Sequence, residues 1–318
     1  MTESDFLALL RPLATHPAAR GLMDDAAVLS GFGGGDLVFT HDMLVEGVHF
    51  LADDPPADVA WKLLAVNLSD LAAKGAVPVG VLLGYPLSDD AWDRAFVAGL
   101  GEAMAVFDVP LLGGDTVRGP RVLSLTAIGR SVIAPSRSGA QAGDALYVTG
   151  VIGRAGLGLK LAQQETRFPE LVEGLSFTLN TAGEKAALRQ AQGSGIGSKI
   201  AIQAYRRPVP RLAEGQALAP IVHAMMDVSD GLLIDAQRMA DASKLALSIN
   251  LDAVPHVGEI MAAITAGDDY ELLFAAAPDA MLPVPAARIG QFSDGTGLTL
   301  CNGDGPVALP QRLGYTHG

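Results

Sequence analysis

Residues 57–76 read ADVAWKLLAVNLSDLAAKGA and carry the strongest helical pattern of the N-terminal half. Apolar side chains recur every three or four residues and form one stripe, which consists of Ala60, Leu63, Leu64, Leu68 and Leu71. Gly75 is suited to end the helix. Asn67, Asp70 and Lys74 follow a second, polar line, which we expect to lie off the apolar stripe.

Short apolar segments flank this helix on both sides. DLVFTHD (36–42) and VGVLLGYPL (79–87) predict strands, and PSRSGAQAG (135–143) has the chemistry of a turn. Strands and helices alternate without a simple βαβ repeat, which predicts an α/β fold of α+β character with mixed sheets. We therefore expect two domains, an N-terminal one over 1–137 and a C-terminal one over 138–318.

The second half contains one stretch of different composition. Residues of about 163–200 are rich in Gln, Glu, Gly and Ser, and their weak periodicity predicts a surface insertion. Beyond it, DVSDGLLIDAQRMADAS (227–243) predicts a helix opened by Ser229 and Asp230. GDDYELLFAAA (267–277) predicts an acidic turn that leads into a strand.

The charge and cysteine content exclude some classes of protein. The chain has 35 acidic against 22 basic residues, a net charge of -13, so a bare nucleic acid surface would be repelled. Its one cysteine, Cys301, excludes an intramolecular disulfide and fits a reducing compartment. MTESDFLALL (1–10) lacks the pattern of a signal peptide, and no apolar run approaches the ~18 residues of a membrane span. We expect a cytoplasmic protein without a membrane partner.

Aspartates are the side chains that most suggest chemistry. They recur beside the ends of predicted elements, at Asp25, Asp42, Asp70, Asp115, Asp227 and Asp230. Carboxylate oxygens are natural ligands of Mg²⁺, which also binds substrate phosphates. Taken singly, each aspartate is better explained as a helix cap or a turn residue. GGDT (113–116) allows two interpretations: a glycine-opened loop that approaches a phosphate, or an ordinary turn after a strand.

Several familiar catalytic patterns are absent from the sequence. There is no G-x-x-x-x-G-K-[ST] phosphate loop and no G-x-S-x-G nucleophile turn. No cysteine or histidine cluster has the spacing of a zinc site. TGVIGRAGLG (149–158) does not have the glycine spacing of a dinucleotide loop, which favours a tight turn into a helix.

Eight ordered segments together resemble the thiamine-monophosphate kinase family. They are DDAAVL (24–29), THDMLVEGVHF (40–50), AVNLSDLAAKGA (65–76), LLGGDTVRGP (111–120), SRSGAQAGD (136–144), YVTG (147–150), DVSDGL (227–232) and GDDYELLF (267–274). The wider superfamily includes aminoimidazole ribonucleotide synthetase and selenophosphate synthetase. The resemblance implies transfer of a phosphoryl group from ATP to thiamine monophosphate. It also implies a homodimer whose N-terminal domains pair their strands into a barrel-like sheet.

The resemblance also implies roles for individual residues. Several Mg²⁺ ions would be held by Asp25, Thr40, His41, Asp42, Asp70, Asp115, Asp227 and Asp230. ATP would contact Gly114, Asp115, Arg137 and Ser229. His49 would contact thiamine monophosphate.

The chain departs from the family pattern at four points. Asp268 stands where a longer glutamate usually contacts the substrate, and Arg312, with Tyr315 close by, stands where an aromatic contact is expected. His41 replaces a Thr or Cys, which is harmless if the metal contact is made by the backbone carbonyl. The 163–200 insertion is longer than the usual connection.

The acceptor's own chemistry indicates the mechanism. A phosphate ester is already largely ionised near neutral pH, so no catalytic base is required, and we expect direct in-line transfer. One alternative is another ATP-dependent enzyme of the superfamily; selenophosphate synthetase is disfavoured because the chain has no cysteine before Cys301. The other is a nucleotide- or metal-binding protein without turnover, suggested by Asp268 and the missing aromatic.

Overall fold

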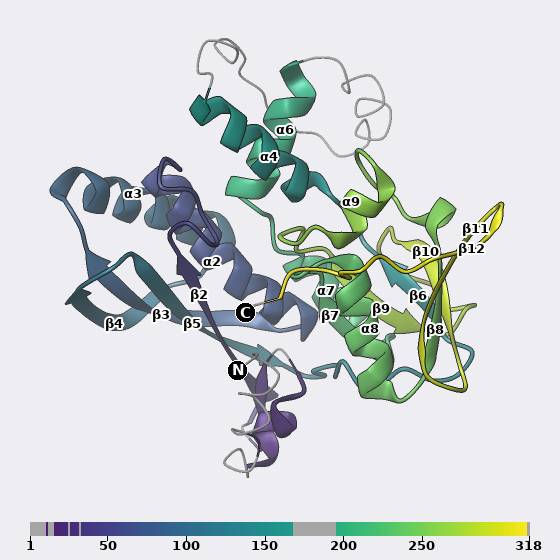
Figure 1. Cartoon of the computed structure of the whole chain (residues 1–318). Coiled ribbons are helices and arrows are strands. Elements are labelled where there is room, and N and C mark those ends of the chain that lie inside the picture. Colours follow the sequence, from purple (N-terminus) through teal and green to yellow (C-terminus); the bar gives the residue numbers. More distant parts are fainter. Residues whose placement is uncertain (1–10, 12–15, 25, 32, 168–194, 317–318) are drawn as a thin grey trace.

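The protein folds around two mixed β-sheets with helices packed on them (Figure 1). The computed structural model describes residues 11, 16–24, 26–31, 33–167 and 195–316. Asp25 and most of the predicted insertion, 168–194, lie outside the described residues. The mixed α/β architecture in two halves confirms the predicted fold class.

Among the described residues, the first sheet has five strands and is open at both edges. Its order is β1 (Ala27–Leu29), β2 (Asp36–Val45), β5 (Val122–Ser131), β3 (Val77–Leu87) and β4 (Leu111–Arg118). All neighbours pair antiparallel except β3 and β4, which are parallel. The strands predicted at 36–42 and 79–87 are confirmed. A short 3₁₀ helix, η2 (Pro17–Leu22), precedes the sheet.

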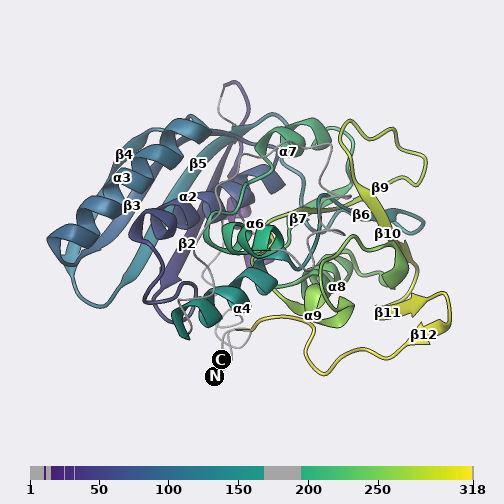
Figure 2. The same cartoon turned by 90° about the horizontal axis from the view of Figure 1, so that it is seen from above.

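The helix predicted over 57–76 is α2 (Pro56–Ala73), and with α3 (Asp90–Phe107) it covers one face of the first sheet (Figures 1 and 2). Every residue of α2 from Val59 to Ala73 is buried, including the polar line. The reason is that α2 packs on β2 and β5 with one side and on helix α7 (Leu212–Leu218) and strand β7 (Ala224–Asp227) with the other. The polar line therefore faces the interior between the two halves.

The second sheet has seven strands. Their order is β12 (Gly305–Val307), β11 (Gly297–Asn302), β8 (Ala246–Asn250), β10 (Ala287–Ser293), β6 (Ala145–Val148), β9 (Leu272–Ala276) and β7. Only β8 and β11 pair in parallel. The segment between β5 and β6, residues 132–144, joins the two sheets. The predicted domain boundary at 137/138 falls in this segment and stays a prediction.

Helices cover both faces of the second sheet. Leu146, Met226 and Leu273 point to one face, where they share a core with α8 (Leu232–Ser243) and α9 (Ile260–Thr265). Tyr147, Met225 and Phe274 point to the other and share a core with α7 and the end of α2. The short η4 (Leu251–Ala253) follows β8.

Two further helices project from the second half. They are α4 (Arg154–Arg167) and α6 (Gly195–Arg206), which lie side by side (Figure 1). Glycine permits this packing, because a Cβ at Gly158 would lie 2.0 Å from the carbonyl oxygen of Ala201. Both ends of the predicted insertion are thus helical. Within the described ranges, no helix is long and apolar enough to cross a membrane.

Candidate functional site

Four of the predicted aspartates approach one another where the two halves meet. Asp42 comes from β2, Asp70 from α2, Asp227 from the end of β7, and Asp230 from the loop before α8. Their charges act on one another: Asp230 on Asp42, and Asp42 and Asp227 on Asp70. These four side chains are called the carboxylate cluster below.

Two members of the cluster, Asp70 and Asp227, each accept a hydrogen bond from a hydroxyl group on a neighbouring element. The Thr40 hydroxyl donates to Asp70, and the Ser69 hydroxyl donates to Asp227 Oδ2 at 2.5 Å. The Thr40–Asp70 bond links β2 to α2, and the Ser69–Asp227 bond links α2 to β7. Buried α2 therefore connects the carboxylates of the two halves.

Burial and mutual repulsion hinder ionisation of the cluster. Burial, followed by the charge of Asp230, raises the pKa of Asp42 to about 6. Burial and the charges of Asp42 and Asp227 raise the pKa of Asp70 well above its usual value, against the Thr40 hydrogen bond. Burial raises the pKa of Asp227 to about 7, against the Ser69 hydrogen bond. Carboxylates in this arrangement favour protons or cations beside them.

The cluster is not a closed metal site. Among the residues that the structure describes, no three Asp, Glu, His or Cys side chains are arranged to hold one ion. The aspartates can influence one another without forming a metal site, because the two effects have different ranges. Charges interact over several ångströms, whereas the ligands of one ion must all lie within about 2.0–2.6 Å of it. The side chains thus share a charged region without surrounding a common point.

The loop between β7 and α8 is held by a buried carboxylate that the sequence did not single out. Asp235 Oδ2 accepts hydrogen bonds from the backbone N–H groups of Ser229, Asp230 and Gly231 at 3.1, 3.0 and 3.2 Å. The prediction that Ser229 and Asp230 open the helix by capping it is wrong, since Gly231 occupies the cap and no side chain bonds there. Asp230 instead pairs with Arg238 at 2.5 Å.

The acidic turn at 267–270 is joined to this loop through the backbone. Asp268 N donates to the carbonyl of Ser229 at 2.8 Å, and Tyr270 N donates to the carbonyl of Val228 at 2.8 Å. Gly267 makes the approach possible, because a Cβ there would lie 2.4 Å from Ser229 O. Ser229 and Asp268, predicted for different ligands, are therefore neighbours.

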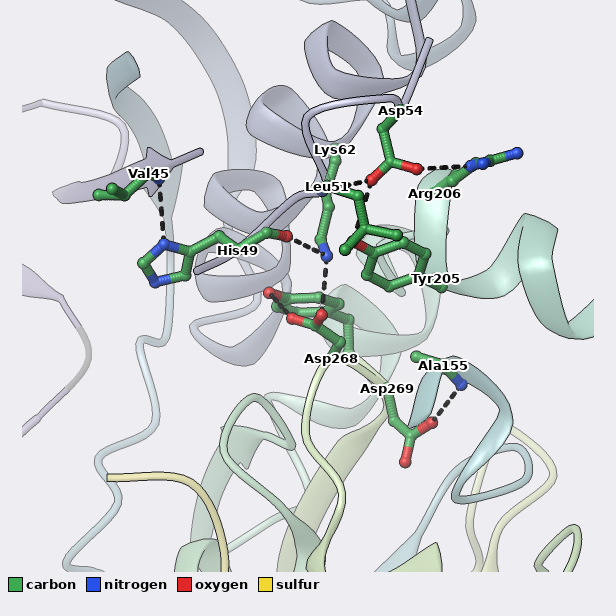
Figure 3. Close-up of polar contacts among 11 residues, drawn as sticks. Val45, His49, Leu51, Asp54, Lys62, Ala155, Tyr205, Arg206, Asp268 and Asp269 are labelled. Carbon is green, nitrogen blue, oxygen red and sulfur yellow. Dashed lines mark hydrogen bonds and ion pairs between the residues drawn. The ribbon is translucent and has the colours of Figure 1, made fainter. Parts of the chain in front are cut away.

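A buried lysine joins the 267–270 turn to the N-terminal half (Figure 3). Lys62 Nζ on α2 donates to the carbonyl of His49 at 2.9 Å and to Asp268 Oδ2 at 2.7 Å. The ring of His49 accepts the backbone N–H of Val45 on Nδ1 at 3.0 Å, which turns Nε2 away from this contact. The predicted substrate residues His49 and Asp268 are thus brought together. Sequence reasoning missed Lys62, whose signal was a lone charge inside an apolar helical stretch.

The second aspartate of the turn has a structural role. Asp269 accepts the N–H groups of Gly153 and Ala155 at 2.7 and 3.3 Å, at the start of α4. Burial raises the pKa of Asp269 to about 8. The GDDYELL segment therefore directs one carboxylate toward the N-terminal half and the next toward α4 (Figure 3).

Arg137 lies within electrostatic reach of the cluster member Asp227, and its contact with ATP stays a prediction. Burial lowers the pKa of its guanidinium, against the charges of Asp24, Asp235 and Asp227. Asp24 is a buried neighbour that pairs with Lys74 at 2.6 Å and with Arg20 at 2.5 Å. These cations outweigh burial and hold the pKa of Asp24 below its usual value. Asp24 thus holds the N-terminal segment against α2.

Gly114 and Asp115 lie apart from the cluster in the single chain. Both interpretations of GGDT, as a glycine-opened loop and as a turn after a strand, are wrong, because all four residues belong to edge strand β4. A Cβ at Gly114 would lie 1.9 Å from Leu83 O, so glycine is needed for β4 to pair with β3. In the strand order, β5 and β3 stand between β2 and β4, which puts Asp115 about 14 Å from Asp42 at the usual strand spacing.

The side chain of His41 points away from the cluster, and that of Arg312 is in contact with solvent. On β2 the side chain of His41 alternates with Thr40 and Asp42, and its Nδ1 contacts the Thr126 hydroxyl at 2.8 Å on the opposite face. Only the backbone of His41 remains on the side of the cluster. Arg312 is exposed, whereas Tyr315 N donates to the carbonyl of Asp230 at 2.9 Å. The backbone of Tyr315 therefore lies beside Asp230.

Comparison with known proteins identifies the family of both halves of the chain. Residues 23–131 match the family "AIR synthase related protein, N-terminal domain", and 141–304 match its C-terminal domain. A thiamine-monophosphate kinase of Caulobacter vibrioides is 38% identical, over all of this chain and 91% of the relative.

Two solved structures are similar over nearly the whole chain. AaThiL complexed with AMPPCP and TMP has a TM-score of 0.83 and 25% identity, covering 100% of this chain and 97% of that one. Thiamine-monophosphate kinase from Stenotrophomonas maltophilia K279a has a TM-score of 0.71 and 34% identity, covering 96% of each chain. By its sequence over both halves and by its fold, this chain belongs to the thiamine-monophosphate kinase family, a family of kinases.

Proposed function

We propose that the chain transfers the γ-phosphoryl group of ATP to the phosphate of thiamine monophosphate, giving ADP and thiamine diphosphate. The observation that carries the proposal is the carboxylate cluster, in which aspartates from both halves approach one another through α2. Family membership names the acceptor, since AaThiL forms a complex with AMPPCP and TMP. The cluster supplies a reason for divalent cations to accompany these anions.

Mg²⁺ fits the donor set of the cluster. The donors are hard carboxylate oxygens, and burial together with repulsion makes their uncompensated charges costly. The residues proposed to hold the ions are Asp25, Thr40, His41 through its backbone, Asp42, Asp70, Asp115, Asp227 and Asp230. When bound, Mg²⁺ neutralises phosphate charge and so lets two anionic substrates approach each other.

The chain's own side chains bind and orient the substrates. Gly114, Asp115, Arg137 and Ser229 are proposed to contact ATP, and His49, Asp268 and Arg312 to line the site of the acceptor. An oxygen of the acceptor phosphate forms the new bond to the γ-phosphorus, and the bond from that phosphorus to the β,γ-bridging oxygen breaks as ADP leaves. The acceptor oxygen is already ionised, so no side chain has to remove a proton. Catalysis then consists of alignment and charge neutralisation.

We expect ADP release with thiamine monophosphate at least about 100-fold faster than with free thiamine, whose hydroxyl would need a general base that this proposal does not include. The measurement is a coupled ADP assay with ATP and excess Mg²⁺, with aminoimidazole ribonucleotide precursors as comparison substrates. Turnover only with an aminoimidazole precursor would favour another enzyme of the superfamily. Nucleotide binding by calorimetry without any product would favour a binding protein.

We also propose a homodimer formed through the first sheet. Strand β4 is an unpaired edge among the described residues, and all of its residues are exposed. Apolar side chains lie along it and the neighbouring β3, namely Val77, Val79, Leu82, Leu111, Leu112 and Val117. An exposed apolar edge strand pairs readily with a second copy. Such pairing would join the first sheets of two chains into a barrel-like structure.

Val117→Lys is expected to convert the dimer to a monomer, because a charge on an apolar edge strand opposes its pairing. Val117 is 55% exposed in the single chain, so the change leaves the fold of that chain intact. Sedimentation velocity measures the outcome. Val97→Lys on α3, where the side chain is 64% exposed, is the matched control and should stay dimeric. A wild-type chain that sediments as a monomer would contradict the proposal.

A further inference from the structure

Lys62 is a buried ammonium with all of its contacts inside the protein. Its side chain is 2% exposed, and Nζ lies 2.9 Å from His49 O, 2.7 Å from Asp268 Oδ2 and 4.2 Å from the centroid of the Tyr205 ring. Two of these contacts are hydrogen bonds and the third is a cation–π contact. Such a group is costly to bury unless its partners are fixed, which indicates a specific task.

Asp268 is held as firmly as Lys62. Its Oδ1 accepts the Tyr270 hydroxyl at 3.0 Å and its Oδ2 accepts Lys62, so each carboxylate oxygen already has a donor. Its backbone has φ +69, a left-handed conformation that aspartate adopts more readily than most residues. The side chain is nevertheless 29% exposed. The carboxylate of Asp268 is therefore partly exposed to solvent, and the buried ammonium of Lys62 compensates its negative charge.

Tyr270 connects this pair to the carboxylate cluster. Burial raises the pKa of its buried phenol, and the charges of Asp268, Asp42 and Asp227 raise it further. The Tyr270 hydroxyl thus donates to Asp268 at 3.0 Å and also lies within electrostatic reach of two cluster members. Lys62 and Asp268 accordingly border the region where, under the proposed function, an anionic acceptor meets the metal-bound nucleotide.

We infer that Lys62 is a positioning residue that determines the affinity for the phosphorylated acceptor. This inference rests on the proposed function. The ammonium neutralises Asp268 and fixes the His49 carbonyl, so that a phosphate ester approaches a neutral ion pair instead of a bare carboxylate. Asp268 acts here as the partner of Lys62 and not as the acceptor's hydrogen-bonding contact. The pair therefore separates phosphorylated from unphosphorylated ligands by charge.

The inference predicts effects of opposite sign for the two partners. Lys62→Met leaves the carboxylate of Asp268 uncompensated, and we expect binding of thiamine monophosphate to weaken about tenfold or more. Asp268→Asn leaves the ammonium uncompensated, and we expect binding to tighten about two- to fivefold. The double variant Lys62→Met/Asp268→Asn removes both charges and should recover to within about threefold of wild type. If Asp268 instead contacted the acceptor directly, Asp268→Asn would bind thiamine monophosphate more weakly than the wild type.

Binding of free thiamine shows whether a variant acts through the charge of the acceptor's phosphate or through a change in the shape of the site. Free thiamine lacks the phosphate, so its binding should change less than about threefold in all three variants. The experiment is calorimetry of thiamine monophosphate and of free thiamine with the full-length protein, Mg²⁺ and a non-hydrolysable ATP analogue. Arg206→Met is the matched control, because it breaks an ion pair with Asp54, at 2.8 Å, that joins α6 to the segment between His49 and α2. It should not change the ratio of the two affinities.

The outcomes separate this inference from the proposed function. Normal ligand binding without turnover in the wild type would overturn the proposed function and leave the inference standing. Two results would overturn the inference while wild-type turnover stands. One is an equal loss of affinity for both ligands in Lys62→Met, and the other is a double variant whose affinity for thiamine monophosphate does not recover. If Lys62→Met does not fold, Asp268→Asn and the double variant still show whether removing the charge of Asp268 raises or lowers the affinity for thiamine monophosphate. A wild type that binds neither ligand overturns both.

Discussion

Asp70→Asn should lower kcat/KM by about 10³-fold or more, because it removes a charge from the centre of the carboxylate cluster. Asp70 interacts with Asp42 from the first half and Asp227 from the second, so its charge acts on both sides of the site. Asparagine has the same shape and retains an oxygen for the Thr40 hydroxyl. The loss should therefore be chemical and not structural.

The same substitution should leave the metal-free protein as stable as the wild type or more stable. A buried carboxylate that is repelled by Asp42 and Asp227 opposes folding, and the neutral amide removes that repulsion. Activity is measured by ADP release and stability by thermal melting without Mg²⁺. Asp58→Asn on the same helix, where Asp58 pairs with Arg207, is the control and should keep its rate within about threefold. Full activity of Asp70→Asn would remove Asp70 from the site.

The local sequence pattern was sufficient to predict those helices and strands whose type depends on the spacing of their own apolar residues. Helix α2 and strands β2 and β3 were predicted because apolar spacing decides their type. The same spacing could not reveal that α2 lies between the two halves and is buried on all sides. The contacts of α2 with α7 and β7 come from residues about 150 positions later in the chain, and periodicity carries no information about them.

The site was predicted as a set of residues and not as an arrangement. Asp42, Asp70, Asp227 and Asp230 were identified through ordered motifs, and the structure brings them near one another. Their partners were missed because a partner is defined by a contact across the fold. Lys62 meets Asp268 over 206 positions of sequence. Asp235 was overlooked because a carboxylate in the first turn of a helix ordinarily faces solvent, whereas here it is buried beneath the loop.

Some errors came from assigning a local role to a residue with a long-range one. The glycines of GGDT suggested a loop, yet Gly114 serves the close pairing of β4 with β3. Ser229 and Asp230 suggested a helix cap, yet their backbone bonds to Asp235. Both sequences match two physical explanations equally well. Only the neighbouring strand in the first case, and the buried carboxylate in the second, decides between them.

Mg²⁺ is expected to raise the melting temperature of the protein by about 5–10 °C at saturation, and by more at pH 8 than at pH 6. Without Mg²⁺, stability should fall as pH rises. The folded-state pKa of Asp42 is raised to about 6 and that of Asp227 to about 7, whereas an unfolded aspartate has a pKa of about 3.9. Between these values the folded state holds more protons than the unfolded state, so the stabilising effect of protonation is lost as pH rises toward about 7.

The Mg²⁺ effect should have the opposite pH dependence, because the ion binds ionised carboxylates and competes with protons for them. Differential scanning calorimetry at pH 6, 7 and 8 with and without Mg²⁺ measures both slopes. Raised pKa values of Asp235, to about 6, and Asp269, to about 8, add to the metal-free slope, yet these residues are not proposed ligands. The contribution of Asp269 therefore cancels in the Mg²⁺-dependent difference, whereas that of Asp235 changes with the charge of Asp230 beside it. Asp70→Asn should reduce that difference and leave the contribution of Asp269 unchanged. A Mg²⁺ shift that is equal at all three pH values would separate the metal from the carboxylate cluster.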